Sequence, residues 1–206
     1  WGGTWMWRNV VNSSTDLGWL INAIRSNTAT WCTDGSYDKL VAPDISGVGW
    51  LIFDRDTTHI LYGNFFEKSV DAGSYRGEML GSLALHILCS ALETFYDLSP
   101  SSNMFLCDNE STLEEAKKQR LRIPTKSSCS DVLRHMRYMK TTLRMRFNYQ
   151  HVGAHADDHN EWSNLTLEEQ LNCRCDELAK NAVQLALSTP SSATRFLFPR
   201  EGVAVF

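Results

Sequence analysis

The 206-residue chain has the composition of one ordinary globular domain, with 43% hydrophobic residues, 21% charged residues and a net charge of −4. No apolar run approaches the roughly 18 to 20 residues of a membrane span, and no signal-peptide pattern opens the sequence. Six cysteines in a chain of this length do not resemble the disulfide framework of a small secreted domain. We therefore expect an intracellular protein with reduced thiols and no membrane partner.

The small net charge conceals a concentrated basic block. Between Lys117 and Arg146 there are ten Lys and Arg residues and one acid, Asp131, so this segment carries +9 and the rest of the chain −13. Such a block is typical of a surface that contacts phosphate backbones, but runs of like charge also occur as solvated helix faces. Charge alone leaves both interpretations open.

The first 29 residues form a tryptophan-rich extension in which we predict one helix. Its apolar residues follow the helical spacing i, i+3, i+4 and i+7, and Thr15 or Asp16 precedes them as a candidate cap. These apolar residues are Leu17, Leu20, Ile21 and Ile24. At the other end of the chain, residues 188–206 have no periodicity and are interpreted as a tail. One domain remains, over residues 30–187.

Three strands are predicted at the start of this domain. The segments TATWCTDGS, SGVGWLIFD and HILYGNFFEK are bounded by turn residues, and Asp54 to Asp56 mark a tight turn between the last two. We expect these strands to form an antiparallel meander. The period then becomes helical between Tyr75 and Tyr96. The apolar stripe of this helix comprises Leu80, Leu83, Ala84, Ile87, Leu88, Ala91 and Phe95.

Strands and helices alternate in the second half of the domain. NMFLCD is a short buried strand of the type found in parallel sheets, and RMRFNYQHV alternates as a further strand. Helices are predicted near a capping box at Ser111 and Glu114, over residues 129–142 with a cationic outer side, and after a capping box at Thr166 and Glu169. The last helix has an apolar stripe of Leu167, Leu171, Cys175, Leu178, Ala182 and Leu185. This order predicts an α/β fold with a mixed five-stranded sheet, three antiparallel strands followed by parallel ones, flanked by helices.

Four acids occupy notable places in this scheme. Asp34 and Asp108 end two strand segments, Glu78 lies in the first turn of the first long helix, and Asp176 lies beside the apolar stripe of the last. Two carboxylates about 4 Å apart repel by roughly 4 kcal/mol at an effective dielectric near 20, so a cluster of four requires cations. Carboxylate oxygens suit Mg²⁺ or Mn²⁺ better than zinc. Each acid alone has an ordinary structural explanation, and the prediction rests on all four together.

The motifs around these acids resemble those of the ribonuclease H family. The matching segments are TDGS, YRGEMLGSLAL, FLCDNES, VGAHADDH and NCRCDELAK, in that order along the chain. The arrangement is most similar to the ribonuclease H domains attached to reverse transcriptases of eukaryotic retroelements. The resemblance extends from about Thr30 to Val183. It implies a ribonuclease H-like fold and an enzyme that hydrolyses the RNA strand of RNA/DNA hybrids with two Mg²⁺ ions, leaving 5′-phosphate and 3′-hydroxyl ends.

The resemblance also implies a role for each acid. Asp34 would bridge both metal ions, Asp108 and Asp176 would help to hold the ion that activates water, and Glu78 would help to hold the second ion. His155 would assist proton transfer or product release. Mn²⁺ would substitute for Mg²⁺, and the chain would belong with other domains of a parent polyprotein.

A third set of residues is expected to contact the RNA/DNA hybrid. By resemblance, some would line the RNA strand and others would lie towards the minor groove and the backbone, while cations of the basic block would contact phosphates. These residues are Gly35, Ser36 and Asn109 for the RNA strand, Ser74 and Arg76 for the groove and backbone, and Arg134, Arg137 and Lys140 for the phosphates. Recognition by backbone and 2′-hydroxyl would be independent of base sequence.

Three alternatives stay open at this point. The chain could be a non-catalytic ribonuclease H-like module that binds nucleic acid or connects parts of a larger reverse transcriptase. It could also be an integrase or transposase of the same fold. The third alternative is a zinc module, suggested by the three histidines of HVGAHADDH and the two cysteines of CRC. The zinc hypothesis is disfavoured, because His151 lies at a strand end and Gly153 opens a loop, so the histidines share no helical face.

Overall fold

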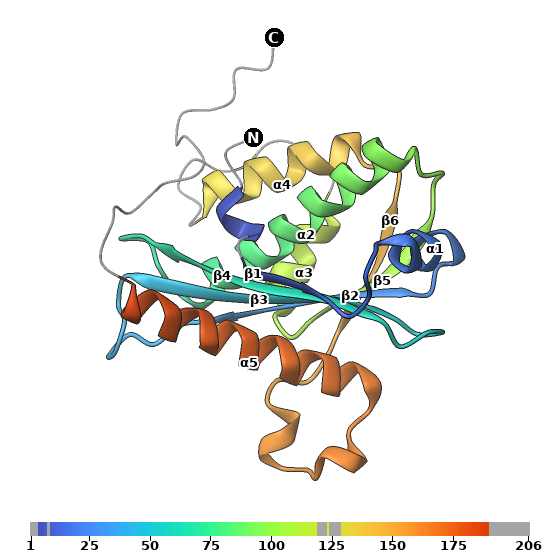
Figure 1. Ribbon diagram of the computed structural model, residues 1–206. Helices are drawn as coiled ribbons and strands as arrows, with labels where there is room; N and C mark the ends of the chain where they lie inside the picture. The colour runs from blue at the N-terminus through green and yellow to red at the C-terminus, as the bar shows by residue number, and fades with distance from the viewer. Residues whose placement is uncertain (1–3, 8, 119–122, 124–128, 190–206) are drawn as a thin grey trace.

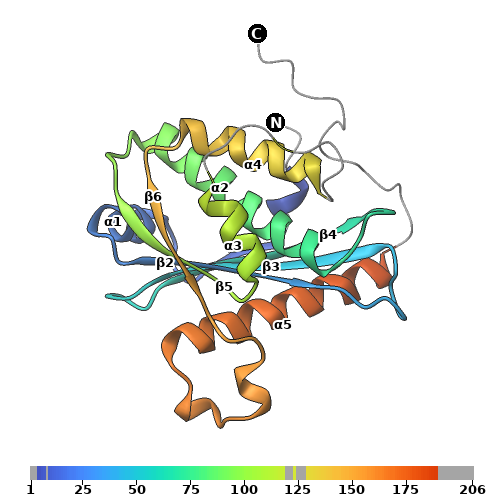
Figure 2. The ribbon, with the colours of Figure 1, turned by 180° about the vertical axis from the view of Figure 1, so that it is seen from behind.

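The computed structural model describes residues 4–7, 9–118, 123 and 129–189. The strands are β1 (Asn9–Asn12), β2 (Ala29–Ser36), β3 (Ile45–Asp54), β4 (Ile60–Lys68), β5 (Ser102–Cys107) and β6 (Arg146–His151). The helices are α1 (Gly18–Ser26), α2 (Ser74–Tyr96), α3 (Glu110–Lys117), α4 (Ser130–Thr142) and α5 (Leu167–Ser188), with short 3-10 helices η1 (Thr4–Trp7), η2 (Ala156–Asp158) and η3 (Trp162–Asn164). A twisted sheet separates α1 to α4 on one face from α5 on the other (Figures 1 and 2).

The described residues form a six-stranded sheet in the order β1-β4-β3-β2-β5-β6. β1 to β4, β4 to β3 and β3 to β2 are antiparallel, whereas β2 to β5 and β5 to β6 are parallel, as the sequence predicts. The predicted number of five strands is wrong, because β1 comes from the tryptophan-rich segment. Val10 and Val11 of this strand are 40% and 46% exposed, so it lacks the alternation that marks a half-buried strand.

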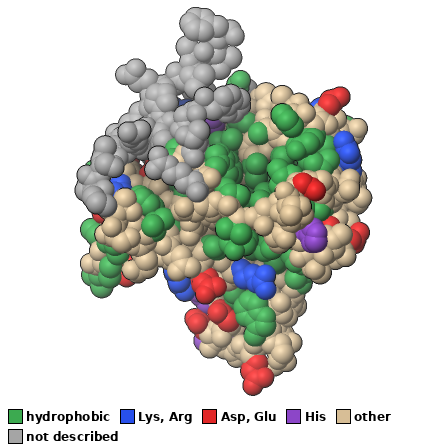
Figure 3. Space-filling model, viewed as in Figure 1, with side chains coloured by type: hydrophobic (Ala, Val, Ile, Leu, Met, Phe, Trp, Pro, Cys, Tyr) green, Lys and Arg blue, Asp and Glu red, His purple; other side chains and the backbone are tan. Residues whose placement is uncertain are grey.

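The hydrophobic core has a layer on each side of the sheet. The larger layer packs α1, α2 and α4 against the sheet and includes the fully buried Trp31, Trp50 and Phe105. The smaller layer packs Leu171 and Cys175 of α5 against the other face. β3 is buried along almost its whole length, since helices cover both of its faces. On the outer side of α5, acidic and basic side chains are mixed (Figure 3).

Helix α2 is the central helix of the fold. By length and composition it could cross a membrane, contrary to our prediction that no run is long and apolar enough, but 67% of its most apolar window is buried inside the protein. Its N-terminal half lies against β2 and β3, and its C-terminal half ends in solvent. The predicted stripe is therefore wrong at Ala91, which is exposed, and at Phe95, which is 81% exposed.

The helix starts test the predicted caps. The Thr166 and Glu169 capping box at the start of α5 is confirmed, with both reciprocal hydrogen bonds present. The Ser111 capping box is wrong. α3 begins earlier, and the side chain of Asn109 accepts the hydrogen bond from the Thr112 N–H at 3.0 Å. Asn109 follows the strand-end Asp108 directly, so α3 starts at the edge of the sheet where the predicted acids lie.

Candidate active site

Strand pairing brings the two strand-end aspartates to one edge of the sheet. β2 and β5 are parallel, with Cys32 paired to Leu106, and Asp34 and Asp108 each lie two residues further along. The carboxyl ends of parallel neighbours meet at the same edge, as the sequence predicts. Burial raises the pKa of Asp34 most, and the charge of Asp108 raises it next. This electrostatic effect is consistent with the closeness of the two carboxyls.

Glu78 reaches the same edge because α2 begins directly over the end of β2. A Cβ atom at Gly35 would lie 2.5 Å from the backbone nitrogen of Glu78, so this close approach requires glycine. The Gly35 N–H donates to Asp34 Oδ1 at 2.6 Å and to Glu78 Oε1 at 2.8 Å. One backbone donor thus holds two carboxylates together.

Asp176 is supplied by α5 from the other face of the sheet. α5 packs on β3 at Gly49, where a Cβ atom would overlap the Cys175 carbonyl. Cys175 is buried in the smaller core layer, and Asp176 follows it at the edge. Asp176 Oδ2 accepts a hydrogen bond from Lys180 Nζ at 2.6 Å and lies 3.7 Å from Nδ1 of His155.

Burial and neighbouring charges raise the pKa values of three of these carboxyls. Burial, and then the charge of Asp108, raises the pKa of Asp34 from 3.8 to about 7. Burial and the charge of Asp34 raise the pKa of Glu78 well above its usual value. Burial also raises the pKa of Asp108, while Asn172 and the charge of His155 act to lower it. Carboxyls with raised pKa values in one cluster are typical of sites that bind cations or carry out proton chemistry.

The donor atoms fit hard divalent cations. Among the described residues, ligand atoms of Glu78, Cys107 and Asp108 lie within 4.8 Å of one another, and the Gly35 N–H ties Asp34 to the same group. Burial, and then the charge of Glu78, raises the pKa of the Cys107 thiol well above its usual value. The thiol therefore stays protonated, and the available ligands are carboxylate oxygens, which suit Mg²⁺ or Mn²⁺.

The histidines and cysteines of the zinc hypothesis lie apart. His151 Nε2 is 2.9 Å from the backbone carbonyl oxygen of Asp108, and His155 is half-exposed beside Asp176. The Cys173 thiol donates to Asp157 Oδ1 at 3.2 Å, while Cys175 is buried in the core. His159 is exposed. Within the described part of the chain these side chains form no common metal site.

Four of the predicted hybrid-contacting residues border the carboxylates. Gly35 and Ser36 end β2 and are partly exposed, and Asn109 is partly exposed where it caps α3. Ser74 is exposed at the first position of α2. All four lie at the ends of β2, α2 and α3, close in sequence to Asp34, Glu78 or Asp108.

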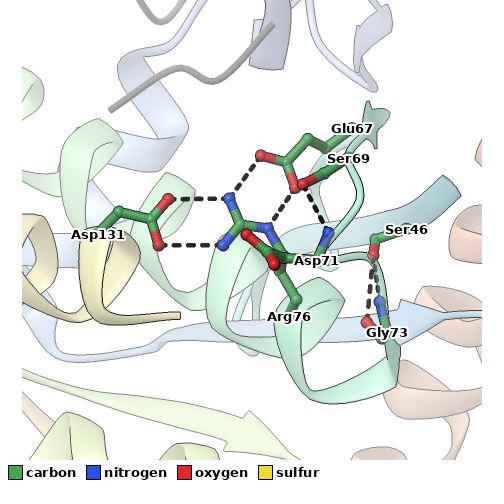
Figure 4. Close-up of polar contacts among 7 residues, drawn as sticks. All are labelled: Ser46, Glu67, Ser69, Asp71, Gly73, Arg76 and Asp131. Atoms are coloured by element: carbon green, nitrogen blue, oxygen red, sulfur yellow. Dashed lines mark hydrogen bonds and ion pairs between the residues drawn. The ribbon is translucent and has the colours of Figure 1, made fainter. Parts of the chain in front are cut away.

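Arg76 is placed differently from our prediction. Its guanidinium is 2% exposed and lies between two carboxylates, with hydrogen bonds to Glu67 at 2.5 and 2.7 Å and to Asp131 at 2.9 and 3.0 Å (Figure 4). Five N–H donors in a planar fork suit two carboxylates at once. A direct contact between Arg76 and nucleic acid is therefore contradicted by its burial. Arg76 instead joins β4, α2 and α4.

The three cations of α4 also differ in exposure. Arg137 is 6% exposed and pairs with Glu115 of α3 at 2.5 Å, so a carboxylate of the same chain already balances its charge. Lys140 is half-buried and donates to the Ala116 carbonyl at the end of α3. Arg134 is partly exposed. The apolar side of α4 packs on α2, which turns part of the predicted cationic face inward.

Three further residues near the carboxylates were not predicted from the sequence. Cys107 precedes Asp108, and its thiol lies 3.5 Å from Glu78 Oε2. Asn172 is 1% exposed and its carboxamide faces Asp108, although its amide nitrogen lies outside hydrogen-bond geometry with any described group. Lys180 pairs with Asp176. Asn172 and Lys180 lie four residues before and after Asp176, a helical spacing that could have revealed them.

This architecture and the position of the acids define the ribonuclease H-like fold. The sequence matches no family model and no curated protein. Solved structures that resemble the chain include ribonuclease H domains, which confirms the predicted fold class at the level of three-dimensional structure.

Three of these structures illustrate the likeness. LC11-RNase H1, isolated from compost, is 17% identical with a TM-score of 0.53, over 79% of this chain and 99% of that chain. The N-terminal RNase H domain of rv2228c from Mycobacterium tuberculosis is 16% identical with a TM-score of 0.52, over 79% and 98%. The PFV RNase H domain is 13% identical with a TM-score of 0.52, over 77% and 95%. At these identities the likeness establishes the fold.

Proposed function

We propose that the chain is a ribonuclease H, an endonuclease that hydrolyses the RNA strand of RNA/DNA hybrids and leaves 5′-phosphate and 3′-hydroxyl ends. The observation that carries the proposal is the convergence of four carboxylates from β2, α2, β5 and α5, two of them sharing the Gly35 N–H. A fold supplies such a costly cluster where cations offset the repulsion. LC11-RNase H1, whose fold is similar, has been solved in complex with an RNA/DNA hybrid.

In this proposal the four acids hold two divalent ions, Mg²⁺ or Mn²⁺. Bound there, the ions would stabilise negative charge on both the attacking and the leaving oxygen of an in-line displacement. Asp34 would help to hold both ions, because it shares the Gly35 N–H with Glu78 and the charge of Asp108 acts on it. The Gly35 N–H keeps Asp34 and Glu78 oriented, and the carboxamide of Asn172 faces the carboxyl of Asp108.

His155 is positioned for a proton-handling role. Its side chain is 53% exposed and lies in the loop before η2, 3.7 Å from Asp176, so it borders both the solvent and the site. Lys180 donates a hydrogen bond to the same oxygen, Asp176 Oδ2, at 2.6 Å. In this proposal Asp176 would help to hold a divalent ion, and His155 beside it would assist proton transfer or product release.

The proposed substrate is recognised by backbone and 2′-hydroxyl. Ser36, Ser74 and Asn109 offer hydroxyl and amide groups around the carboxylates, and such contacts discriminate RNA from DNA without reading bases. We further propose that the chain acts inside the cell as part of a retroelement reverse transcriptase polyprotein. The fold of the prototype foamy virus protease-reverse transcriptase supports this setting, since the match covers 84% of this chain and 22% of that one.

The test is cleavage of an RNA/DNA hybrid labelled on the RNA strand, with Mg²⁺ and with EDTA. We expect cleavage that requires the divalent ion. Asp34→Asn is expected to reduce the rate by more than about 100-fold, because losing even an outer partner of a metal site costs about 10- to 100-fold. Asp56→Asn, which changes an exposed turn carboxyl, is the matched control and should leave the rate unchanged.

Other outcomes identify the alternatives. Hybrid binding without turnover by the folded protein would contradict the enzyme and support a non-catalytic module. Strand transfer on duplex DNA would indicate an integrase or transposase. Cleavage that Asp34→Asn leaves intact would assign the activity to another site or to a contaminant.

A further inference from the structure

A cavity lies between α3, α4 and β6, which are grouped on the side of the sheet seen in Figure 2. Its volume is about 590 Å³, within the range of pockets for small molecules. Five of the described residues that line it are cationic and none is acidic. They are Lys117, Lys118, Arg137, Lys140 and Arg146.

The cations of this basic pocket exceed the acids that neutralise them. Glu115 pairs with both Lys118 and Arg137, each at 2.5 Å. Lys117 and Arg146 are exposed and have no ion-pair partner within the described ranges of the chain. Glu115 therefore balances two cations with one carboxylate. Lys117 and Arg146 line the pocket without an acidic partner among the described residues.

Lys140 is a partly buried cation in the lining of the basic pocket. Its ammonium group donates to the Ala116 carbonyl and lies 5.7 Å above the ring of Tyr149. Burial, and then the charge of Arg137, lowers the pKa of Lys140. An anion between these cations would stabilise the charged form of Lys140, since it would replace the water that burial removes.

The floor of the basic pocket is apolar and aromatic. Met145, Phe147 and Tyr149 contribute to it, together with His86, whose Nε2 lies 2.8 Å from the Tyr149 hydroxyl oxygen. Burial lowers the pKa of His86 to about 4, so the ring is neutral at neutral pH. The positive charge is thus confined to Lys and Arg side chains around an uncharged floor, an arrangement that suits a compact, multiply charged anion.

We propose that this basic pocket binds a phosphate group, at a site separate from the carboxylate cluster. α3 separates the two sites: it begins beside Asp108 and ends at Lys117 after eight residues, about 12 Å at 1.5 Å per residue. One phosphate cannot touch both sites. The phosphate comes either from a nucleic-acid strand that also crosses the carboxylates or from a free phosphate compound, and binding does not depend on the proposed hydrolysis.

The experiment measures binding to the whole chain in EDTA, where divalent ions do not bring nucleic acid to the carboxylates. The probes are a fluorescently labelled single-stranded oligodeoxynucleotide, followed by anisotropy, and inorganic pyrophosphate, followed by calorimetry. The test variant is Lys117→Gln with Arg146→Gln, which removes the two unpaired cations and keeps the apolar stems. Arg25→Gln with Lys39→Gln is the control, because both residues are exposed, lie outside the basic pocket and change the net charge equally.

We expect the wild-type protein and the control to bind at least one probe, and the test variant to bind it at least about tenfold more weakly. For the oligonucleotide, the salt dependence of the logarithm of the binding constant should fall by about 0.7 for each lost phosphate contact. Competition by pyrophosphate would identify a free phosphate compound as a ligand. Oligonucleotide binding without pyrophosphate binding would identify the strand.

The proposal is overturned if neither probe binds, or if the test variant and the control bind equally. Circular dichroism of both variants verifies that they are folded. The hybrid cleavage assay is independent of these results, because it requires divalent ions and the carboxylates. Loss of phosphate binding with intact cleavage, or the reverse, therefore separates a failure of this proposal from a failure of the proposed nuclease function.

Discussion

Ionisation of Asp34 is unfavourable in the folded protein without bound cations. Asp34 is 4% exposed, it neighbours three other carboxyls, and its pKa is raised from 3.8 to about 7. In the folded protein the carboxyl therefore binds its proton more tightly than in the unfolded chain. Without divalent ions, ionisation of Asp34 works against folding, whereas a bound cation reverses the effect.

The pH dependence of stability follows from this shift. Between pH 3.8 and about 7 the Asp34 carboxyl holds more protons in the folded than in the unfolded state, so in EDTA its contribution to the free energy of unfolding should fall as pH rises and level off above about 7. Asp34→Asn should flatten this slope and stabilise the metal-free protein at pH 8 by up to about 4 kcal/mol. Urea denaturation at a series of pH values measures both effects.

Asp56→Asn is again the matched control, since it removes an exposed carboxyl. Parallel pH profiles for the wild-type protein and Asp34→Asn would contradict the electrostatic account of the site. Addition of Mg²⁺ should stabilise the wild-type protein more than Asp34→Asn, because only the wild-type cluster retains its central carboxylate.

At the scale of elements, Arg76 connects three parts of the fold. Glu67 comes from β4, Arg76 from the first turn of α2 and Asp131 from the first turn of α4, with side chains 1%, 2% and 10% exposed. This ion-pair cluster anchors the turn of α2 that also carries Glu78. It also fixes the start of α4, whose other end borders the basic pocket.

Loss of Arg76 should therefore destabilise the whole fold. Arg76→Gln leaves two buried carboxylates without their cation, and we expect a loss of about 3 to 5 kcal/mol in the free energy of unfolding at pH 7. Burial already raises the pKa of Glu67, so Glu67 should take up a proton in the variant and the loss should shrink at lower pH. Denaturant unfolding at pH 7 and pH 5 measures the difference.

The control for this variant is Arg55→Gln. Arg55 pairs with Glu168 at 2.6 Å, but the two side chains are 35% and 23% exposed, so its loss should cost at most about 1 kcal/mol. Equal losses for the two variants would show that burial of the Arg76 cluster contributes nothing particular to stability.

At the scale of the whole molecule, the tryptophan-rich segment is part of the packed fold. β1 covers the edge of β4, the rings of Trp5 and Phe65 meet edge to face at 4.8 Å, and Trp7 meets Trp50 at 5.4 Å. Met6 between the two tryptophans is fully buried. The described residues before α1 therefore cover apolar surface and an otherwise open strand edge.

This packing predicts that Met6 matters although it lies far from the site. Met6→Ala should lower the free energy of unfolding by about 2 to 5 kcal/mol, as expected when a buried side chain is truncated. Met6→Leu preserves volume and should cost less than about 1.5 kcal/mol. Thermal or urea unfolding measures both, and hybrid cleavage by the folded variants should be unchanged. Equal stability of Met6→Ala and the wild-type protein would mean that the segment does not pack in solution.

The sequence by itself determined what depends on neighbouring residues. Spacing and turn residues located α2, α5 and the parallel pair β2 and β5, and that pair brought Asp34 and Asp108 to one edge. The capping box at Thr166 is equally local. In each case the responsible interactions join residues that are close in sequence, or follow from the direction of two strands.

Only the tertiary structure decided which charges are buried and which strand closes the sheet. Arg76 looked like a surface cation, yet its partner Asp131 lies 55 residues away, and Arg137 is neutralised by Glu115, 22 residues before it. β1 became a strand only because β4, remote in sequence, offered an open edge. The physical reason is the same for Arg76, Arg137 and β1. Their hydrogen-bond and ion-pair partners come from distant parts of the chain and determine the free energy of burial, and no local sequence pattern identifies those partners.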